Sequence, residues 1–240
     1  MDTDAQQQDD AERDCVSGPV KTGRRRWSRS ARLCMGVASL LGVLLLVSAF
    51  VVQPFLIPSS SMTPTLEVGD RVLVNKLAYR IGNSPGRGDV VVFDGRESFV
   101  NEEGADGNPA TGLVRKAGAA VGLMKPAETD YVKRVIGVGG DRVRCCDKRG
   151  RIEVNGVALD EGYLHEGDDP SAVPFDIDVP HGRLWVMGDH RSDSSDSRDH
   201  LGDPGGGTVP VDRVIGRADG IGWPAKRWGP VPNAEAGAHG

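Results

Sequence analysis

The chain has few aromatic residues for its length of 240 residues. Aromatic side chains make up 5% of the sequence, whereas 33 glycines and 15 prolines are spread through it. Such a composition argues against a fold of long helices and favours short strands joined by many turns. The length allows one domain of good size with appendages at its ends.

Cysteines are also scarce, and the four present do not define a metal site or a disulfide framework. Cys15 and Cys34 lie near the N-terminus, and no Cys-x-x-Cys pair or cluster of histidine with cysteine occurs. Structural zinc sites need such spacings. Cys145 and Cys146 are adjacent, and they could form a vicinal disulfide, pair between chains or remain thiols. The sequence implies no metal, nucleotide or organic cofactor.

Charge is missing altogether from residues 33–52, where only Ser39 and Ser48 carry polar side chains. Twenty residues of helix extend about 30 Å, the thickness of the hydrocarbon core of a bilayer. We therefore expect a transmembrane helix over residues 33–53. A cleavable signal peptide is the alternative, with residues 47–49 as the cleavage site, but the apolar run is longer than such peptides use.

Charges in residues 1–32 are segregated, with acidic residues first and a basic block directly before the apolar run. The basic residues nearest that run are Arg24, Arg25, Arg26, Arg29 and Arg32. Such a block could bind nucleic acid, but the apolar run after it favours a membrane anchor. The positive-inside rule then predicts a cytoplasmic leader at 1–32, a single span in the plasma membrane, and an extracytoplasmic domain.

The rest of the chain repeats one theme, a Gly-Asp turn followed by a β-rich run. These runs cover residues 71–78, 90–93 and 142–145, and further ones cover 131–138, 183–187 and 213–218. Asn155-Gly156 between two short runs predicts a two-residue hairpin turn. We expect a mainly β, antiparallel domain at 54–224, with a loop insertion at 97–129 and a flexible tail at 225–240.

Three stretches of this domain could carry chemistry. Ser59, Ser60 and Ser61 lie in a turn bracketed by prolines, directly after the apolar run. On a strand over 131–138, Lys133 would share a face with Tyr131 and Val135, and Arg134 would point the other way. Burial among apolar neighbours would move the pKa of that lysine from ~10.4 toward ~7–8, which suits a general base.

The third stretch, residues 188–198, is a dense polar loop after an apolar run. It contains His190, which leaves open a Ser/His/Asp triad with an aspartate of the same loop.

Together these stretches resemble the type I signal peptidases (leader peptidases) of bacteria, with an actinobacterial-like character. Five motifs in the expected order carry the resemblance, at residues 58–65, 69–79, 87–93, 131–137 and 188–198. The resemblance implies an antiparallel β-sheet domain of signal-peptidase type behind one N-terminal span. It also implies a membrane-bound serine endopeptidase that removes signal peptides from exported preproteins, cutting after Ala-x-Ala sites.

By that resemblance Ser61 is the nucleophile and Lys133 the general base. Ser59 and the Ser61 backbone N–H form the oxyanion hole, and Ser194 orients the lysine amine. A supporting network of ion pairs is formed by Arg134, Asp189, Asp196 and Arg198. Small pockets for the substrate alanines are lined by Ile57, Met62, Leu66, Tyr131 and Val132.

The chain departs from the family pattern where His190 and Asp193 replace the usual asparagines. The resemblance makes signal peptides and membrane lipid the partners, with an apolar surface that would include Phe55, Leu56 and Ile57. Two other interpretations are a self-cleaving Ser/Lys protease and an anchored envelope protein without activity. The first needs a DNA-binding module that the short leader cannot supply, and the second predicts no proteolysis. The sequence gives no prediction of oligomeric state.

Overall fold

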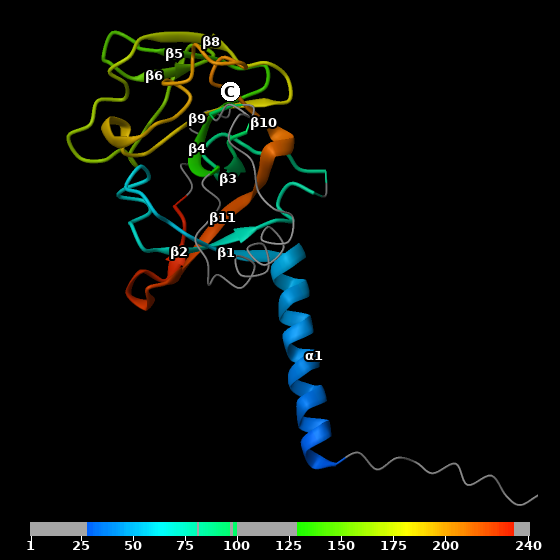
Figure 1. The fold of residues 1–240 in the computed structure, drawn as a ribbon. Helices are drawn as coiled ribbons and strands as arrows, with labels where there is room; N and C mark the ends of the chain where they lie inside the picture. Colours follow the sequence, from blue (N-terminus) through cyan, green and yellow to red (C-terminus); the bar gives the residue numbers. More distant parts are fainter. Residues whose placement is uncertain (1–27, 81, 97, 100–128, 233–240) are drawn as a thin grey trace, which may run out of the picture. The chain divides into compact units, whose positions relative to one another are not determined.

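The computed structural model describes residues 28–80, 82–96, 98–99 and 129–232 (Figure 1). The chain falls into two compact units, one ending at Leu40 and the other beginning at Leu41. All the strands belong to the second unit.

The helix α1 spans Arg29–Phe50 and is followed by strand β1, Val52–Leu56. It therefore ends three residues before the expected boundary, because Pro54 favours an extended residue before it and β1 pairs with β2. Apolar side chains are exposed along α1, including those of Leu33, Leu40 and Phe50. Nevertheless, no helix in the described part of the chain combines the length and the hydropathy of a membrane span.

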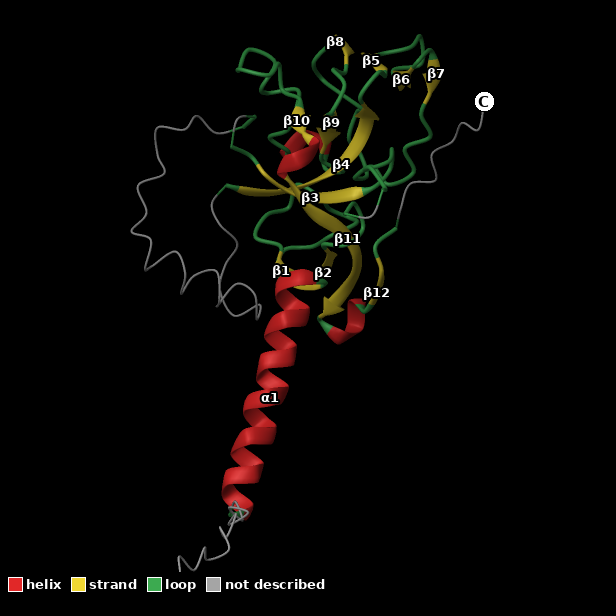
Figure 2. Ribbon diagram, turned by 90° about the vertical axis from the view of Figure 1, so that its right-hand side faces the viewer, coloured by secondary structure: helices red, strands yellow, loops and turns green. Residues whose placement is uncertain are grey.

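The larger of two antiparallel sheets has eight strands. The strand order is β1-β2-β11-β3-β4-β9-β10, and β12 pairs with β11 (Figure 2). The strands after β1 are β2 (Arg71–Asn75), β3 (Val90–Asp94), β4 (Asp130–Val138), β9 (Arg183–Met187), β10 (Val209–Pro210), β11 (Val214–Trp223) and β12 (Gly229–Pro230).

Strand β11 lies between two hairpin-like pairs of the large sheet. On one side it pairs with β2, which in turn pairs with β1. On the other side it pairs with β3, which in turn pairs with β4. This late segment of the chain therefore joins two earlier ones.

A smaller four-stranded sheet has the order β7-β6-β5-β8. Its strands are β5 (Arg142–Cys145), β6 (Ile152–Val154), β7 (Val157–Ala158) and β8 (Phe175–Asp178). The predicted hairpin turn joins β6 and β7, with positive φ angles of 54° at Asn155 and 79° at Gly156. Such a pair matches the twist of the flanking strands. Cys145 and Cys146 at the end of β5 form a disulfide, one of the three states that the sequence left open.

Three hydrophobic clusters hold the sheets. The first lies around β1, β2 and β11, and it contains Phe55, Ile57, Met62, Leu66 and Val132. The second joins the small sheet to β4 and β9 around Trp185. The third lies on the other face of β3 and β4, around Phe93 and Val135. Strand β4 contributes to all three clusters, so its side chains are fixed from both faces.

The three Gly-Asp turns have the same hydrogen-bond pattern. In each turn the aspartate accepts the backbone N–H of the residue three positions earlier. Asp70, Asp89 and Asp141 accept from Glu67, Gly86 and Val138 at 2.9, 2.9 and 2.8 Å. The repeated dipeptide is thus a side-chain lock on a tight turn, which explains why it recurs before strands.

Two further expectations need correction. Residues 225–232 are not a flexible tail, because Ala225–Arg227 forms a 3₁₀ helix and β12 pairs with β11. Phe55 and Ile57 are 4% and 3% exposed in the first cluster, so they do not form an apolar outer surface. Nearly all of the expected insertion at 97–129 lies outside the described residues, as do residues 1–27 and 233–240.

Candidate active site

Ser61 lies in the turn between β1 and β2. The ends of this turn are joined by hydrogen bonds between Ile57 and the 69–70 backbone, both 2.9 Å long. Met62 and Leu66 are buried in the first cluster, at 1% and 0% exposed. Because two buried side chains follow Ser61 in the turn, its backbone is held in place against the sheet.

Lys133 projects from the middle of β4 toward Ser61. Its Nζ donates to Ser61 Oγ at 2.8 Å, and the lysine is 3% exposed. Val91 is its partner on β3, and Val135 is two residues further along β4. Burial lowers the pKa of Lys133 to about 8, with Asp196 opposing that shift and Arg198 adding to it. The structure thus places a buried amine, easily deprotonated, against a hydroxyl.

Arg134, the next residue of β4, makes a quite different set of contacts. Its guanidinium donates to both carboxylate oxygens of Asp189, at 2.8 and 2.6 Å, and both side chains are 0% exposed. It also donates to the Gly88 carbonyl and lies over the ring of Tyr163. The predicted opposition of Lys133 and Arg134 on β4 is therefore seen, as is the predicted ion pair with Asp189.

The loop 188–198 reaches Ser61 through its backbone. The His190 N–H donates to the Ser61 carbonyl at 3.1 Å. At Gly188 a Cβ would lie 2.5 Å from the Ser61 carbonyl oxygen and 2.2 Å from Ser194 Oγ. Only glycine fits this close approach of two chain segments, and the sequence alone gave no signal for it beyond the motif.

Ser194 does not make the hydrogen bond that the sequence predicts. Its hydroxyl donates to Asp196 at 2.8 Å, and among the described residues it has no hydrogen bond with Lys133. A carboxylate two residues away is the stronger acceptor and takes the single proton of the hydroxyl, so Ser194 does not donate to Lys133. Asp196 also accepts from Arg198 Nε at 2.8 Å and from the Gly188 N–H at 3.0 Å. The expected pair of Asp196 and Arg198 is present, and it fixes the loop.

Ser59 lies beside the nucleophile candidate, with its Oγ 3.5 Å from that of Ser61. Of the residues expected to line substrate pockets, Ile57, Met62, Leu66 and Val132 gather in the first cluster. Tyr131 does not join them, because alternation along β4 turns it to the opposite face from Val132. There it packs against Phe93 and Phe99.

His190 is not placed as a catalytic base for Ser61. Its Nδ1 lies 3.0 Å from Thr63 Oγ1, whereas the hydroxyl of Ser61 meets Lys133. Asp193, the other departure from the family pattern, accepts a short hydrogen bond from Ser60. The two unusual residues thus contact the turn on either side of Ser61, His190 at Thr63 and Asp193 at Ser60.

Thr65 belongs to the site, although no role was predicted for it. Its hydroxyl donates a hydrogen bond to Asp189 at 2.5 Å and accepts one from the Arg134 guanidinium at 3.3 Å. It therefore connects the Ser61 turn to the buried ion pair. Its place at the end of the serine motif was the one available signal.

The sequence pattern of the family described as "Signal peptidase, peptidase S26" matches residues 30–223. The chain belongs to this family. Like its relatives it is a signal peptidase of type I, a serine peptidase and therefore a hydrolase.

Several named relatives share most of the chain. Signal peptidase I of Mycobacterium tuberculosis (strain H37Rv) is 43% identical over 246 residues, which cover 92% of this chain and 83% of that protein. A probable signal peptidase I of Mycobacterium leprae is 42% identical, with 80% and 75% covered. Signal peptidase IB of Staphylococcus aureus (strain N315) is 31% identical, with 79% and 87% covered.

Among solved structures, a signal peptidase I from Enterococcus faecalis V583 matches with 22% identity and a TM-score of 0.35. The match covers 56% of this chain and 97% of the other.

Proposed function

We propose that the chain removes signal peptides from exported preproteins by a Ser/Lys dyad, cutting after Ala-x-Ala sites. One observation carries the proposal: Lys133 Nζ lies 2.8 Å from Ser61 Oγ while burial lowers the pKa of that lysine to about 8. A neutral amine at that distance can accept the hydroxyl proton as the oxygen attacks the scissile carbonyl.

The rest of the reaction follows from the same two groups. Attack by Ser61 Oγ forms an acyl-enzyme, and the Lys133 ammonium returns its proton to the leaving amine. Water then attacks the ester while Lys133 takes a proton from it, and Lys133 returns this proton to Ser61 Oγ as the bond to the acyl group breaks. The Ser61 N–H and the Ser59 hydroxyl are proposed to stabilise the oxyanion, which the 3.5 Å separation of the two serine oxygens supports.

Specificity for small side chains is proposed to come from the apolar residues around the Ser61 turn. Ile57, Met62, Leu66 and Val132 are packed in one cluster next to the dyad. A tightly packed apolar wall admits alanine and excludes larger side chains by steric clash.

We also propose that α1 anchors the enzyme in the plasma membrane, with its N-terminus in the cytoplasm. The uncharged run at 33–52 and the arginines before it support this topology. Lipid contact by the catalytic domain is supported by Trp223 and Trp228, which are 59% and 77% exposed. Tryptophan is favoured at the interface between lipid and water.

The decisive test uses the full chain in detergent with a preprotein carrying one Ala-x-Ala site. We expect a single cut after the site, and a loss of kcat/KM on the order of 10⁴-fold in Ser61→Ala and in Lys133→Ala. Lys133→Arg should be equally inactive, because arginine keeps the charge but cannot act as a base. Lys226→Ala, which removes an exposed lysine, is the matched control.

Two results would contradict the dyad. Activity retained in Lys133→Ala but lost in His190→Ala would transfer the role of base to the histidine. Cleavage by none of the forms, even with lipid present, would leave an envelope protein without proteolytic activity.

A further inference from the structure

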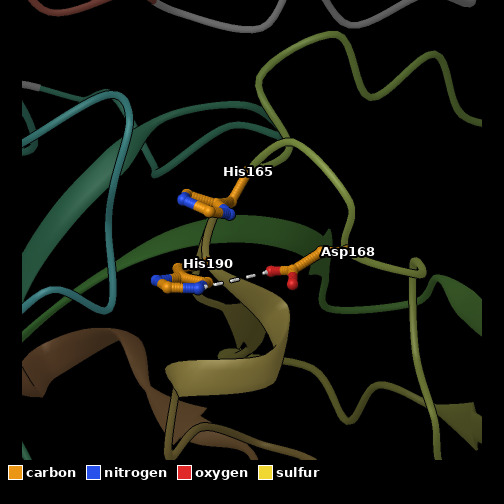
Figure 3. A group of neighbouring side chains, drawn as sticks. All are labelled: His165, Asp168 and His190. Carbon is orange, nitrogen blue, oxygen red and sulfur yellow. Dashed lines mark ion pairs between the residues drawn. The ribbon is translucent and has the colours of Figure 1, made fainter.

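His165, Asp168 and His190 form a second polar cluster, which takes no part in the dyad. One ligand atom from each lies within 4.8 Å of the other two, and all three residues are partly buried (Figure 3). Their backbones are tied together, since the His165 N–H donates to the Asp189 carbonyl and the Asp168 N–H to the His165 carbonyl. The cluster is therefore a built feature of two packed loops.

The hydrogen bonds around His190 favour one assignment of its ring proton. Thr63 Oγ1 donates its only proton to the Ser60 carbonyl at 2.9 Å. The same oxygen, 3.0 Å from His190 Nδ1, must then accept from an Nδ1–H. In the neutral ring Nε2 consequently keeps its lone pair, and this nitrogen faces Asp168 Oδ2 at 4.0 Å.

The carboxylate of Asp168, the second candidate metal ligand, is fixed by hydrogen bonds. Ser192 donates its hydroxyl to Oδ1 at 2.7 Å and its N–H to Oδ2 at 3.2 Å. An anionic oxygen and an imidazole lone pair thus face each other across a gap too wide for a hydrogen bond.

His165 supplies the third candidate metal ligand. Its ring stacks on that of His190, with centroids 3.9 Å apart and an angle of 17° between the planes. Figure 3 shows the two rings layered, with Asp168 beside His190. Among the described residues, no hydrogen bond engages the His165 ring, so both of its nitrogens remain available.

We propose that His165, Asp168 and His190 bind a divalent transition-metal ion of the zinc class. Two imidazoles and one carboxylate are a ligand set that zinc takes, with a further position left for water. Bonds of about 2.1 Å place tetrahedral ligands about 3.4 Å apart, whereas the present atoms lie within 4.8 Å of one another, so the cluster must contract by up to about 1.4 Å. The His165 ring must also rotate out of the stack, because the ion lies in the plane of each ring, whereas His190 keeps its hydrogen bond to Thr63.

The surroundings of the donors suit such an ion. Metal-bound histidines commonly use their second nitrogen to donate a hydrogen bond, as His190 Nδ1 does to Thr63. The Ser192 hydrogen bonds orient the carboxylate in the same way. A bound ion would link the loop at 161–170 to the loop at 188–198, whose His190 N–H holds the Ser61 carbonyl.

The test is direct titration of zinc into the untagged, chelator-stripped full chain in detergent, followed by calorimetry. We expect the parent to bind one more ion than His165→Ala or Asp168→Ala, or to bind it at least about 100-fold more tightly. Zinc should also raise the Tm of the parent alone, because the unfolded chain lacks the site. Neither measurement depends on peptidase activity, so its result is independent of the dyad.

Matched controls are His181→Ala and Asp169→Ala, which remove exposed groups outside the cluster. Equal loss in these controls, or no difference between the parent and the cluster variants, overturns the proposal. Ring resonances of the parent's histidines give a reading that needs no variant. Zinc should shift those of His165 and His190, and shifts confined to His181 or His200 would also overturn the site.

Discussion

Lys133 and Arg134 are neighbours on β4, and the regions on either side of the strand treat their cations in opposite ways. The Arg134 side supplies Asp189, which matches the guanidinium with two hydrogen bonds at zero exposure. The Lys133 side offers the amine one side-chain hydrogen bond among the described residues, to the neutral hydroxyl of Ser61. Arg134 thus has a matched counter-ion, while burial lowers the pKa of Lys133 to about 8.

The difference teaches how one strand can serve two purposes. A buried guanidinium with a matched carboxylate is a fixed strut, since arginine does not release its proton in proteins. A buried lysine without a contacting carboxylate is instead a group whose charge is costly, so its proton is easily lost. Structure and chemistry are thus divided between two successive residues.

Asp189→Ala should have the largest effect on stability, because it leaves Arg134 buried without its counter-ion. We expect the free energy of unfolding to fall by about 3–5 kcal/mol, because an uncompensated buried charge remains. Denaturant titration measures the loss. Asp176→Ala removes the partner of the exposed Arg142 and should cost far less, because solvent screens exposed ion pairs. Similar losses in the two variants would show that the buried pair is not special.

Lys133→Met should have the opposite sign. Near pH 7 the free energy of unfolding should rise by roughly 3 kcal/mol, since each pKa unit of depression corresponds to about 1.4 kcal/mol. Between pH 8 and 10.5 the unfolded parent holds more protons than the folded one, so its stability rises with pH and the gain disappears. Denaturant titrations across this range measure it, with Lys226→Met as the exposed control. A gain independent of pH would contradict the charge explanation.

Gly188→Ala tests the loop that serves both sides of β4. The added Cβ would meet the Ser61 carbonyl and Ser194 Oγ at 2.5 and 2.2 Å, so the nucleophile must shift. We expect kcat/KM for preprotein cleavage to fall on the order of 10²-fold. Gly162→Ala is the control, since no atom lies within 4 Å of its Cβ position. Full activity in Gly188→Ala would mean that the loop is not packed tightly against Ser61.

The smallest effect is the dependence of the rate on pH. Because the neutral amine is the active form, kcat/KM should rise about tenfold per pH unit below pH 8 and become constant above it. Asp196→Asn should move the midpoint downward, since the Asp196 charge raises the pKa of Lys133. An unchanged midpoint, or a rate that declines through pH 8, would be inconsistent with Lys133 as the base.

Local signals were enough to predict part of the fold. The boundaries of β5 and β9 agree with the β-rich runs, and the Asn155-Gly156 turn is where it was expected. Strand β1 was missed because an apolar run near a predicted span reads as helix, whereas its pairing with β2 decides the outcome. Strand β8, Phe175–Asp178, alternates apolar and acidic residues, but four residues are too few to predict a strand, and its pairing with β5 decides the outcome.

The candidate site was predicted to a similar extent. The pairing of Ser61 with Lys133 and the opposed direction of Arg134 followed from motif and alternation. The partner of Ser194 and the position of Tyr131 could not be predicted, because each depends on which neighbour is nearer in space. The close approach at Gly188 and the histidine cluster likewise arise only when distant loops pack together.

The place of β11 in the large sheet has a consequence for the order of synthesis. Ser61 follows β1 and Lys133 lies on β4, and within the large sheet the two pairs of strands are joined by β11. When both residues have left the ribosome, the nascent chain still lacks the strand that joins the two halves of the sheet. We therefore expect the dyad to assemble late in translation, once β11 has left the ribosome and paired with β2 and β3.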